Sequence, residues 1–174
     1  IIKRCTYCNE FNKLSGIDRV NSLLSYEIDN CVACCGYCNI MKGDKSLKNF
    51  KKIIEYLVYI NKFIVKSDEK NSKICKYKNL FENANDPKFY RFVCDAKNRK
   101  VSVDIDENKW KNTICKPCHY CKNDFNKVGA NGIDRKNSAF GYFSDNIVPC
   151  CKTCNLMKNV QSVDDFYSRI KKIY

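Results

Sequence analysis

The feature that most constrains the fold is an internal repeat. Residues 15–42 read SGIDRVNSLLSYEIDNCVACCGYCNIMK, and residues 131–158 read NGIDRKNSAFGYFSDNIVPCCKTCNLMK. Counted from the glycine of each GIDR, the two stretches match without a gap at Gly, Ile, Asp, Arg, Asn, Ser, Tyr, Asp, Asn, Val, three Cys, Asn, Met and Lys. A repeat of roughly 55 residues in a chain of this length predicts two small domains.

Each repeat is too small to fold on an apolar core alone, and its cysteines offer a metal staple. The chain has 14 cysteines. A Cys-x-x-Cys turn places both sulfurs on one side of the backbone, so two such turns complete a tetrahedral zinc site. The sequence therefore predicts two structural Zn²⁺ ions, with the ligand sets Cys5, Cys8, Cys35, Cys38 and Cys118, Cys121, Cys151, Cys154.

A disulfide framework is the alternative use of these cysteines. The sequence shows no secretory signal, and Cys-x-x-Cys spacing is typical of zinc sites, so metal is favoured. We accordingly expect a reducing compartment, either cytoplasm or nucleus, or a virion, and not secretion. Cys34 and Cys150 precede the third ligand of each site and are expected to be small buried side chains. Cys115 could replace Cys118 as a ligand, but Cys118 is favoured because it matches Cys5.

A helix is expected to close each repeat. Ser46 is a good N-cap, and apolar residues follow it at helical spacing as far as Ile60. Ser162 followed by Asp165 resembles a capping box, and apolar residues continue at helical spacing to Ile173. Both repeats are therefore predicted to end in an amphipathic helix.

A helix-strand-helix segment is expected to lead into the second repeat. Asp86-Pro87 is a good helix start, residues 101–105 alternate as a strand, and a short helix is expected around Trp110. We therefore expect a first module at 1–64, a linker or loop at 65–85, and a second module at 86–174 that includes this segment. No such segment precedes Cys5, and the first residue is Ile, so we expect the sequence to be part of a longer chain.

The order of the motifs resembles the HNH endonuclease family. Cys-x-x-Cys, an Ile-Asp strand, an Asn and then Cys-x-x-Cys-Asn-x-x-Lys is similar to the zinc-stapled ββα-metal module of that family. It is closest to a GIDR/CCxxCN variant found in viral and phage proteins. The resemblance covers 5–61 and 118–174, together with the lead-in from Ala96 to Trp110. It implies an α+β fold of two tandem treble-clef zinc modules joined by the helix-strand-helix segment.

The resemblance also implies roles for repeated polar residues. In the family, the first strand carries a ligand of a catalytic divalent metal, followed by a histidine that activates water. Three pairs match that site: the metal ligand (Asp18 and Asp134), the residue that completes the metal site from the helix (Asn39 and Asn155), and the asparagine that orients the base (Asn30 and Asn146). A catalytic Mg²⁺ is expected only if a module is active.

The family's general base is absent from both repeats. Arg19 and Arg135 hold its position, and a guanidinium cannot accept a proton near neutral pH. The single histidine, His119, lies inside a Cys-x-x-Cys turn and is expected to point to solvent. An arginine can instead bind two phosphate oxygens. The alternative is a salt bridge to the preceding aspartate, and we expect Asp134 to engage Arg135 and bind no catalytic metal.

The overall charge favours a polyanionic partner. The net charge is +13 at pH 7, and basic surfaces attract nucleic acid, although scattered lysines also occur on ordinary solvated surfaces. Lys42 and Lys158 are expected to be solvent-exposed or to lie along a phosphate path. Tyr26 and Tyr142 are expected to pack over the helix. No run of 18 apolar residues is present, so no membrane partner is expected.

Three hypotheses for function follow. We favour a zinc-binding, catalytically degraded protein that binds nucleic acid, with DNA favoured, or that builds a larger assembly such as a capsid. The alternative is a divalent-metal-dependent DNA endonuclease that uses Asp134 and Asn155, with Asp18 and Asn39 in the other repeat. A third hypothesis is a purely structural protein, which the even spread of basic residues favours.

Overall fold

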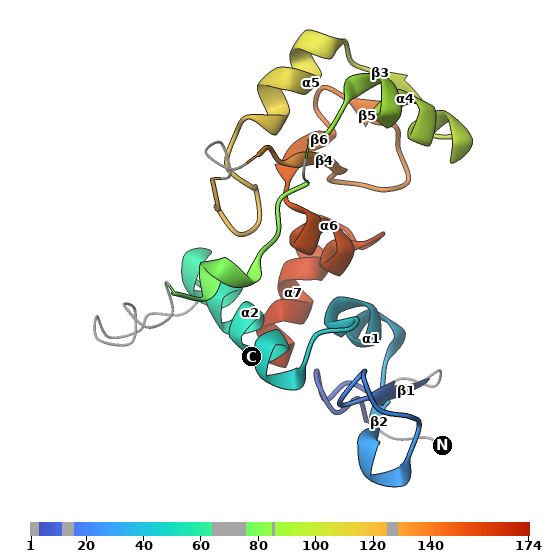
Figure 1. The fold of residues 1–174 in the computed structure, drawn as a ribbon, viewed down its shortest axis with the longest axis vertical. Helices are drawn as coiled ribbons and strands as arrows, with labels where there is room; N and C mark the ends of the chain where they lie inside the picture. The colour runs from blue at the N-terminus through green and yellow to red at the C-terminus, as the bar shows by residue number, and fades with distance from the viewer. Residues whose placement is uncertain (1–3, 12–15, 64–75, 85, 125–128) are drawn as a thin grey trace. The chain divides into compact units, whose positions relative to one another are not determined.

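The structure is a computed structural model that describes residues 4–11, 16–63, 76–84, 86–124 and 129–174. The first part of the predicted linker, 65–75, lies outside the described residues. Within them, the chain is α+β, with helices and three two-stranded sheets (Figure 1). The predicted fold class is therefore confirmed at the level of a mixed α+β chain with small sheets.

The chain forms two compact units. Unit 1 comprises Ile1–Leu80 together with Asp165–Tyr174, and unit 2 comprises Phe81–Asp164. The predicted second module, 86–174, differs from unit 2 because the last residues pack in unit 1. There, Arg169 and Lys172 form ion pairs with Glu10, contacts that the local sequence pattern does not reveal.

Unit 1 is built on a short hairpin and a long helix. Strand β1 (Gly16–Arg19) pairs antiparallel with β2 (Cys31–Cys34), with the 3-10 helix η1 (Ile28–Asn30) before β2. Helices α1 (Gly36–Lys42) and α2 (Leu47–Ile60) follow, and η2 (Lys76–Leu80) ends the continuous part of the unit. The predicted cap of α2 is confirmed, because the backbone N–H of Asn49 donates to Ser46 Oγ at 3.2 Å.

Unit 2 contains the predicted helix-strand-helix segment as α4 (Phe89–Asn98), β3 (Val103–Asp104) and α5 (Glu107–Ile114). Strands β4 (Gly132–Arg135) and β6 (Ile147–Cys150) pair antiparallel, and β5 (Tyr142–Phe143) pairs parallel with β3. Helix α6 (Lys152–Lys158) follows, and α7 (Val163–Ile173) runs on into unit 1. The predicted helix start at Asp86 is wrong: Lys88 is the N-cap, and its exposed side chain pairs with Asp86 instead.

The two faces of the β4-β6 hairpin have different surroundings. Opposed residues share a face, so Ile133 and Arg135 lie on one side with Pro149 and Ile147, while Asp134 and Val148 lie on the other. The first side carries the apolar core of unit 2. Its buried members are Ala96, Trp110, Ile114, Ile133, Tyr142 and Ile147.

Candidate metal centres and the buried aspartate-lysine pairs

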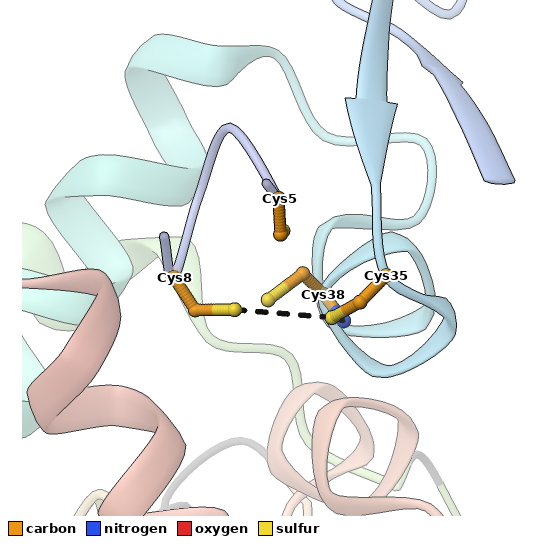
Figure 2. A group of neighbouring side chains, drawn as sticks. All are labelled: Cys5, Cys8, Cys35 and Cys38. Carbon is orange, nitrogen blue, oxygen red and sulfur yellow. Dashed lines mark hydrogen bonds between the residues drawn. The ribbon is translucent and has the colours of Figure 1, made fainter. Parts of the chain in front are cut away.

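The first candidate metal centre joins a tight turn to the start of α1. The backbone N–H of Asn9 donates to the carbonyl of Cys5, and Asn9 takes a left-handed φ of 56°, which turns Cys5 and Cys8 to the same side. Cys35 is the N-cap of α1, and its Sγ accepts from the backbone N–H of Cys38 at 3.4 Å. Figure 2 shows the four side chains converging, and all four are buried.

The second centre repeats this arrangement in unit 2. The backbone N–H of Lys122 donates to the carbonyl of Cys118, again with a left-handed φ, here 58°. Cys151 caps α6 and accepts from the backbone N–H of Cys154 at 3.4 Å. The four sulfurs of Cys118, Cys121, Cys151 and Cys154 lie within 4.8 Å of one another, as do those of the first centre.

The spacing of the sulfurs fits zinc. Zn–S distances of about 2.3 Å in a tetrahedron imply sulfurs about 3.8 Å apart. The Sγ atoms of Cys8 and Cys35 are 3.9 Å apart, and those of Cys121 and Cys151 are 3.7 Å apart. None of the cysteines in the described residues forms a disulfide. Two buried four-cysteine clusters, made of the residues predicted as ligands, can therefore each hold a zinc ion, which confirms the predicted cofactor.

One thiol in each cluster is unusually acidic. Burial raises the pKa of Cys5, but the backbone N–H groups around it outweigh burial and bring its pKa to about 7. Hydrogen bonds from the other cysteines, Cys121 first, lower the pKa of Cys118. In contrast, burial raises the pKa of Cys8 to about 11. Such shifts are expected where several thiols crowd one site and the first thiolate is stabilised by its neighbours.

The remaining cysteines near the clusters are not ligands. Cys34 and Cys150 are buried, and each Sγ donates to the carbonyl of the following cysteine, at 3.3 Å and 3.4 Å. Cys115 is exposed at the end of α5, and Cys118 belongs to the cluster, as predicted. His119 is half-buried rather than fully in solvent, and its ring lies edge-on to that of Tyr120. Its pKa is lowered, chiefly by burial.

The first centre carries an arginine that sequence analysis missed. Arg169 of α7 directs Nη1 at Cys35 Sγ (3.6 Å) and Cys8 Sγ (3.8 Å), and the same atom lies 3.3 Å from Glu10 Oε2. Its guanidinium also lies over the ring of Tyr37, 4.7 Å from the centroid. Four thiolates around one Zn²⁺ leave a net negative charge, which the guanidinium of the half-buried Arg169 offsets.

Beneath each hairpin, a buried aspartate and a buried lysine form a triad with a tyrosine. In unit 2, Lys158 Nζ is 3.0 Å from Asp134 Oδ2, and the Tyr120 hydroxyl donates to the same oxygen at 2.6 Å. Lys158 also donates to the Arg135 carbonyl at 2.8 Å. Burial raises the pKa of Asp134, against the opposing hydrogen bonds of Tyr120 and Lys158.

Unit 1 contains the same triad. Lys42 Nζ lies 3.1 Å from Asp18 Oδ2 and donates to the Arg19 carbonyl at 2.7 Å, while the Tyr7 hydroxyl donates to Asp18 at 2.5 Å. The prediction that Lys42 and Lys158 are exposed or follow a phosphate path is wrong. Both are fully buried, because the aspartate draws each ammonium inward.

The two arginines close loops instead of pairing with the aspartates. Arg135 Nη1 donates to the carbonyls of Ser138 (2.9 Å) and Phe140 (2.7 Å), and Arg19 Nη1 donates to that of Leu24 (2.9 Å). Each guanidinium also lies over a tyrosine ring seven positions on, Tyr26 or Tyr142. The predicted engagement of Asp134 with Arg135 is therefore wrong, since Lys158 occupies that carboxylate.

The asparagines matched to the family site have separate surroundings. Asn146 Nδ2 donates to the carbonyls of Asn137 and Gly141, and its Oδ1 accepts from the Asn137 backbone N–H. Asn30 makes the equivalent bonds in unit 1. Both therefore hold the loop after the first strand. Asn39 and Asn155 are exposed on α1 and α6, whereas Asp18 and Asp134 are buried.

Sequence reasoning missed the tyrosines and the second asparagine of each loop. Tyr7 and Tyr120 hold the same place in the two Cys-x-x-Cys turns, directly before the second cysteine. Asn21 and Asn137 also recur in register, and each accepts from the backbone N–H two residues on. Their recurrence in both repeats was the available signal. Arg169 has no such signal, because the matching position in the first repeat is Ile53.

Comparison with known proteins finds a viral relative. The chain is 29% identical over 167 residues to an uncharacterized protein of Acanthamoeba polyphaga mimivirus, and this match covers 95% of the chain. It covers 30% of the viral protein, so the chain spans less than a third of that relative's length. No family model matches the chain, and no solved structure matches it. Among the described helices, none has the length and apolar character to cross a bilayer.

Proposed function

We propose that the chain is a pair of HNH-like treble-clef zinc modules that bind nucleic acid without cleaving it. The observation that carries this proposal is the buried Lys158 beside Asp134, repeated by Lys42 beside Asp18. A carboxylate that binds a catalytic Mg²⁺ needs an open side toward the metal and the substrate. Here the ammonium takes that place.

Electrostatics support the loss of catalysis. A cation 3.0 Å from Asp134 already compensates the carboxylate, so a second cation would meet repulsion where a nuclease offers attraction. Arg135 stands at the position of the base and donates to two backbone carbonyls. Within the described residues, no group of three or more His, Cys, Asp or Glu side chains that could hold a metal includes Asp18 or Asp134. These features favour a binding role.

The charge distribution supports a phosphate-bearing partner. The chain has 32 Lys and Arg against 19 Asp and Glu, and this excess survives the negative charge of two zinc sites with four thiolates each. In unit 2, the last turn of α4 and the residues that follow it carry the exposed basic residues Lys97, Arg99 and Lys100 in close succession. Closely spaced exposed cations of this kind bind phosphates through counterion release.

A second candidate function is a structural part of a larger assembly. The observation that favours it is the exposure of large apolar side chains in the first repeat, led by Ile28 (95%) and Leu23 (93%). Isolated exposed apolar residues are ordinary, but several close together mark contact surfaces. Assembly requires these apolar side chains, whereas nucleic-acid binding requires the exposed basic ones, so the two functions can be separated.

Fluorescence anisotropy with labelled duplex DNA, duplex RNA and single strands tests the proposed function. We expect log affinity to fall linearly with log salt, with a slope of about −0.9 per phosphate neutralised on duplex DNA. The variant Lys97→Gln/Lys100→Gln should make the slope shallower by about one to two units. The matched control is Lys88→Gln, whose exposed side chain pairs with Asp86. Absence of binding to every probe at low salt would refute the proposal and leave the assembly role.

A further inference from the structure

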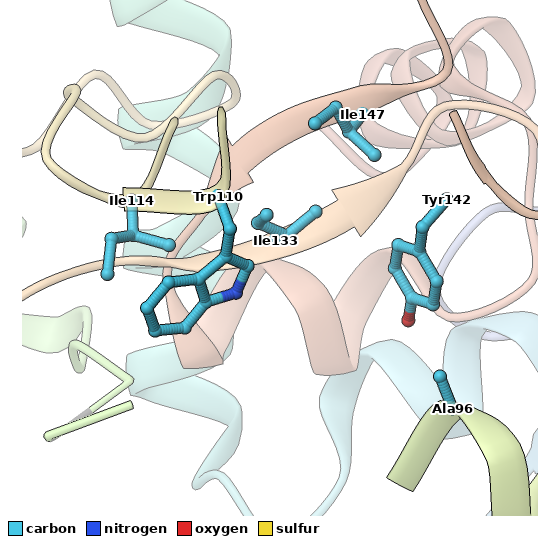
Figure 3. Packing of buried hydrophobic residues seen from close by; sticks show 6 residues of the cluster. All are labelled: Ala96, Trp110, Ile114, Ile133, Tyr142 and Ile147. Carbon is cyan, nitrogen blue, oxygen red and sulfur yellow. The ribbon is translucent and has the colours of Figure 1, made fainter. Parts of the chain in front are cut away.

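The outer face of the hairpin is covered in one repeat and open in the other. In unit 2, α5 and α4 cover this face, and the exposed fractions of Ile133, Tyr142 and Ile147 are 8%, 5% and 8%. Figure 3 shows Trp110 and Ile114 of α5 beside Ile133. Phe92 of α4 meets the Tyr142 ring edge-on, with the centroids 4.7 Å apart.

The first repeat keeps the same residues without the cover. Ile17 and Tyr26 hold the positions of Ile133 and Tyr142, yet they are 54% and 70% exposed. Ala33 lies opposite Ile17 in the register and shares its face. The prediction that Tyr26 packs over the helix is therefore wrong, whereas Tyr142 is buried among aromatic side chains. No described helix lies over this face as α5 lies over β4 and β6, although the Arg19 guanidinium lies over the Tyr26 ring.

Large apolar side chains are exposed at several neighbouring positions of the first repeat. Leu24 and Ile28, each two residues from Tyr26 in the chain, are also exposed, with exposed fractions of 52% and 95%. Solvent-facing positions of a sheet are ordinarily polar, and a contiguous apolar surface marks an interface. We use the name "open face" for Ile17, Leu24, Tyr26, Ile28 and Ala33.

We propose that the open face is the docking surface for an amphipathic helix of a partner protein. The second repeat supplies the template, because α5 presents Trp110 and Ile114 to the equivalent strand residue. The rim specifies the charge of the partner. Glu27 and Asp29 are exposed on either side of Ile28, so the docking helix carries basic residues along the edge of its apolar stripe.

The occupant is a helix and not a full copy of the helix-strand-helix segment. In unit 2, a side chain at Gly141 would place its Cβ 2.6 Å from the carbonyl oxygen of Ser102, so glycine is what allows the chain at β3 to approach. The first repeat has Ser25 at this position. A strand cannot pair there as closely, whereas a helix across Ile17 needs no such approach.

Helices α5, α2 and α7 of a second copy are not free to fill this face. The apolar side chains of α5 are already buried, with Trp110 at 4% and Ile114 at 6%, and those of α2 and α7 lie in the core. The occupant is therefore not taken from these helices of a second copy. The inference is independent of nucleic-acid binding, which uses basic side chains elsewhere.

A stapled helix tests the docking surface in the full chain. The probe is a fluorescein-labelled peptide of residues 106–116, with Cys115→Ser and a lactam between Glu107 and Lys111, which already form an i,i+4 pair. We expect saturable binding in the micromolar range, weakened by about tenfold or more in Ile17→Asp. The peptide with Trp110→Ser should not bind. The matched control, Tyr90→Ser on the exposed side of α4 (80% exposed), should bind like the unmodified chain.

The outcomes separate the alternatives. Zinc content and circular dichroism must be unchanged in Ile17→Asp, and a second variant, Ile28→Asp, repeats the test at a nearly fully exposed position. Equal binding by these variants and the unmodified chain, or no binding at all, overturns the proposal. Sedimentation that shows a dimer of the unmodified chain and a monomer of Ile17→Asp also overturns it, because the face would then belong to a second copy.

Discussion

The ammonium of Lys158 lies 3.0 Å from the carboxylate of Asp134, with 0% and 7% of these side chains exposed. Lys42 and Asp18 form the same pair at 3.1 Å. Buried ion pairs are tolerated only when the remaining donors and acceptors are satisfied. Here Tyr120 and the carbonyl of Arg135 complete the bonding. The pair therefore ties the first strand of the repeat to the last turn of its short helix.

Removal of one partner of the buried ion pair should lower the free energy of unfolding. We expect Lys158→Met to lower the free energy of unfolding by about 3–5 kcal/mol, because Asp134 is left as an unpaired buried charge. The double variant Lys158→Met/Asp134→Asn should recover part of that loss. Lys152→Met, which breaks an exposed pair with Glu82, should cost about 1 kcal/mol or less. Urea unfolding of the zinc-loaded protein measures all three, and equal effects of the two single variants would contradict the role of the pair.

Metal content should follow the two four-cysteine clusters. We expect two Zn²⁺ per chain by elemental analysis, one in Cys118→Ser, and two in Cys115→Ser, since Cys115 is exposed and outside the cluster. Chelation should unfold both repeats, because about 10–16 kcal/mol of apparent folding free energy belongs to each structural site. Less than one zinc per chain, or disulfides among these cysteines, would refute the assignment.

Arg169 should make the two centres unequal. Replacement by Gln removes the guanidinium beside Cys8 and Cys35, and loss of such a supporting contact weakens metal affinity by about 10- to 100-fold. In this variant, one equivalent of zinc per chain, from the first centre, should therefore be released to a chromogenic chelator faster than from the unmodified protein. The release rate of the second equivalent should be unchanged. Lys171→Gln, which removes only a cation over the Phe63 ring, is the control. Two equally accelerated phases would show a general loss of stability instead.

Phosphodiester cleavage should be absent. We expect no nicking of supercoiled plasmid with Mg²⁺ or Mn²⁺. Lys158 forms an ion pair with Asp134, and Arg135, at the position of the family's general base, cannot accept a proton near neutral pH. Arg135→His should add little activity, since the carboxylate stays paired and the surroundings have not been shaped for a base. Nicking by the unmodified protein that is lost in a folded, zinc-loaded Asp134→Asn variant would favour the endonuclease hypothesis.

The parts of the structure predicted from sequence are those that depend on local spacing. The Cys-x-x-Cys turns give the ligand sets, and the Ser46 cap gives the start of α2, because each is decided within a few residues. The α+β class, in contrast, is what the resemblance to the HNH family implies. No local signal places Arg169 against the first centre.

The burial of the lysines could not be predicted in this way. A lysine at the end of a short helix is ordinarily solvated, and its partner Asp18 lies 24 residues away in the chain. Recurrence of a residue in both repeats shows that it is needed but does not show which way it faces. The same limit explains why the sequence predicts a salt bridge between Arg135 and the neighbouring aspartate. In the structure, the donors of Arg135 reach backbone carbonyls further along the loop instead.

The membership of Asp165–Tyr174 in unit 1 has a consequence for synthesis. A ribosome makes the first 80 residues long before these last ten, yet Glu10 finds Arg169 and Lys172 only at the far end of the chain. Unit 2 is continuous and can fold as soon as it leaves the exit tunnel. Of these two units, the one whose synthesis begins first is thus the one that is completed last.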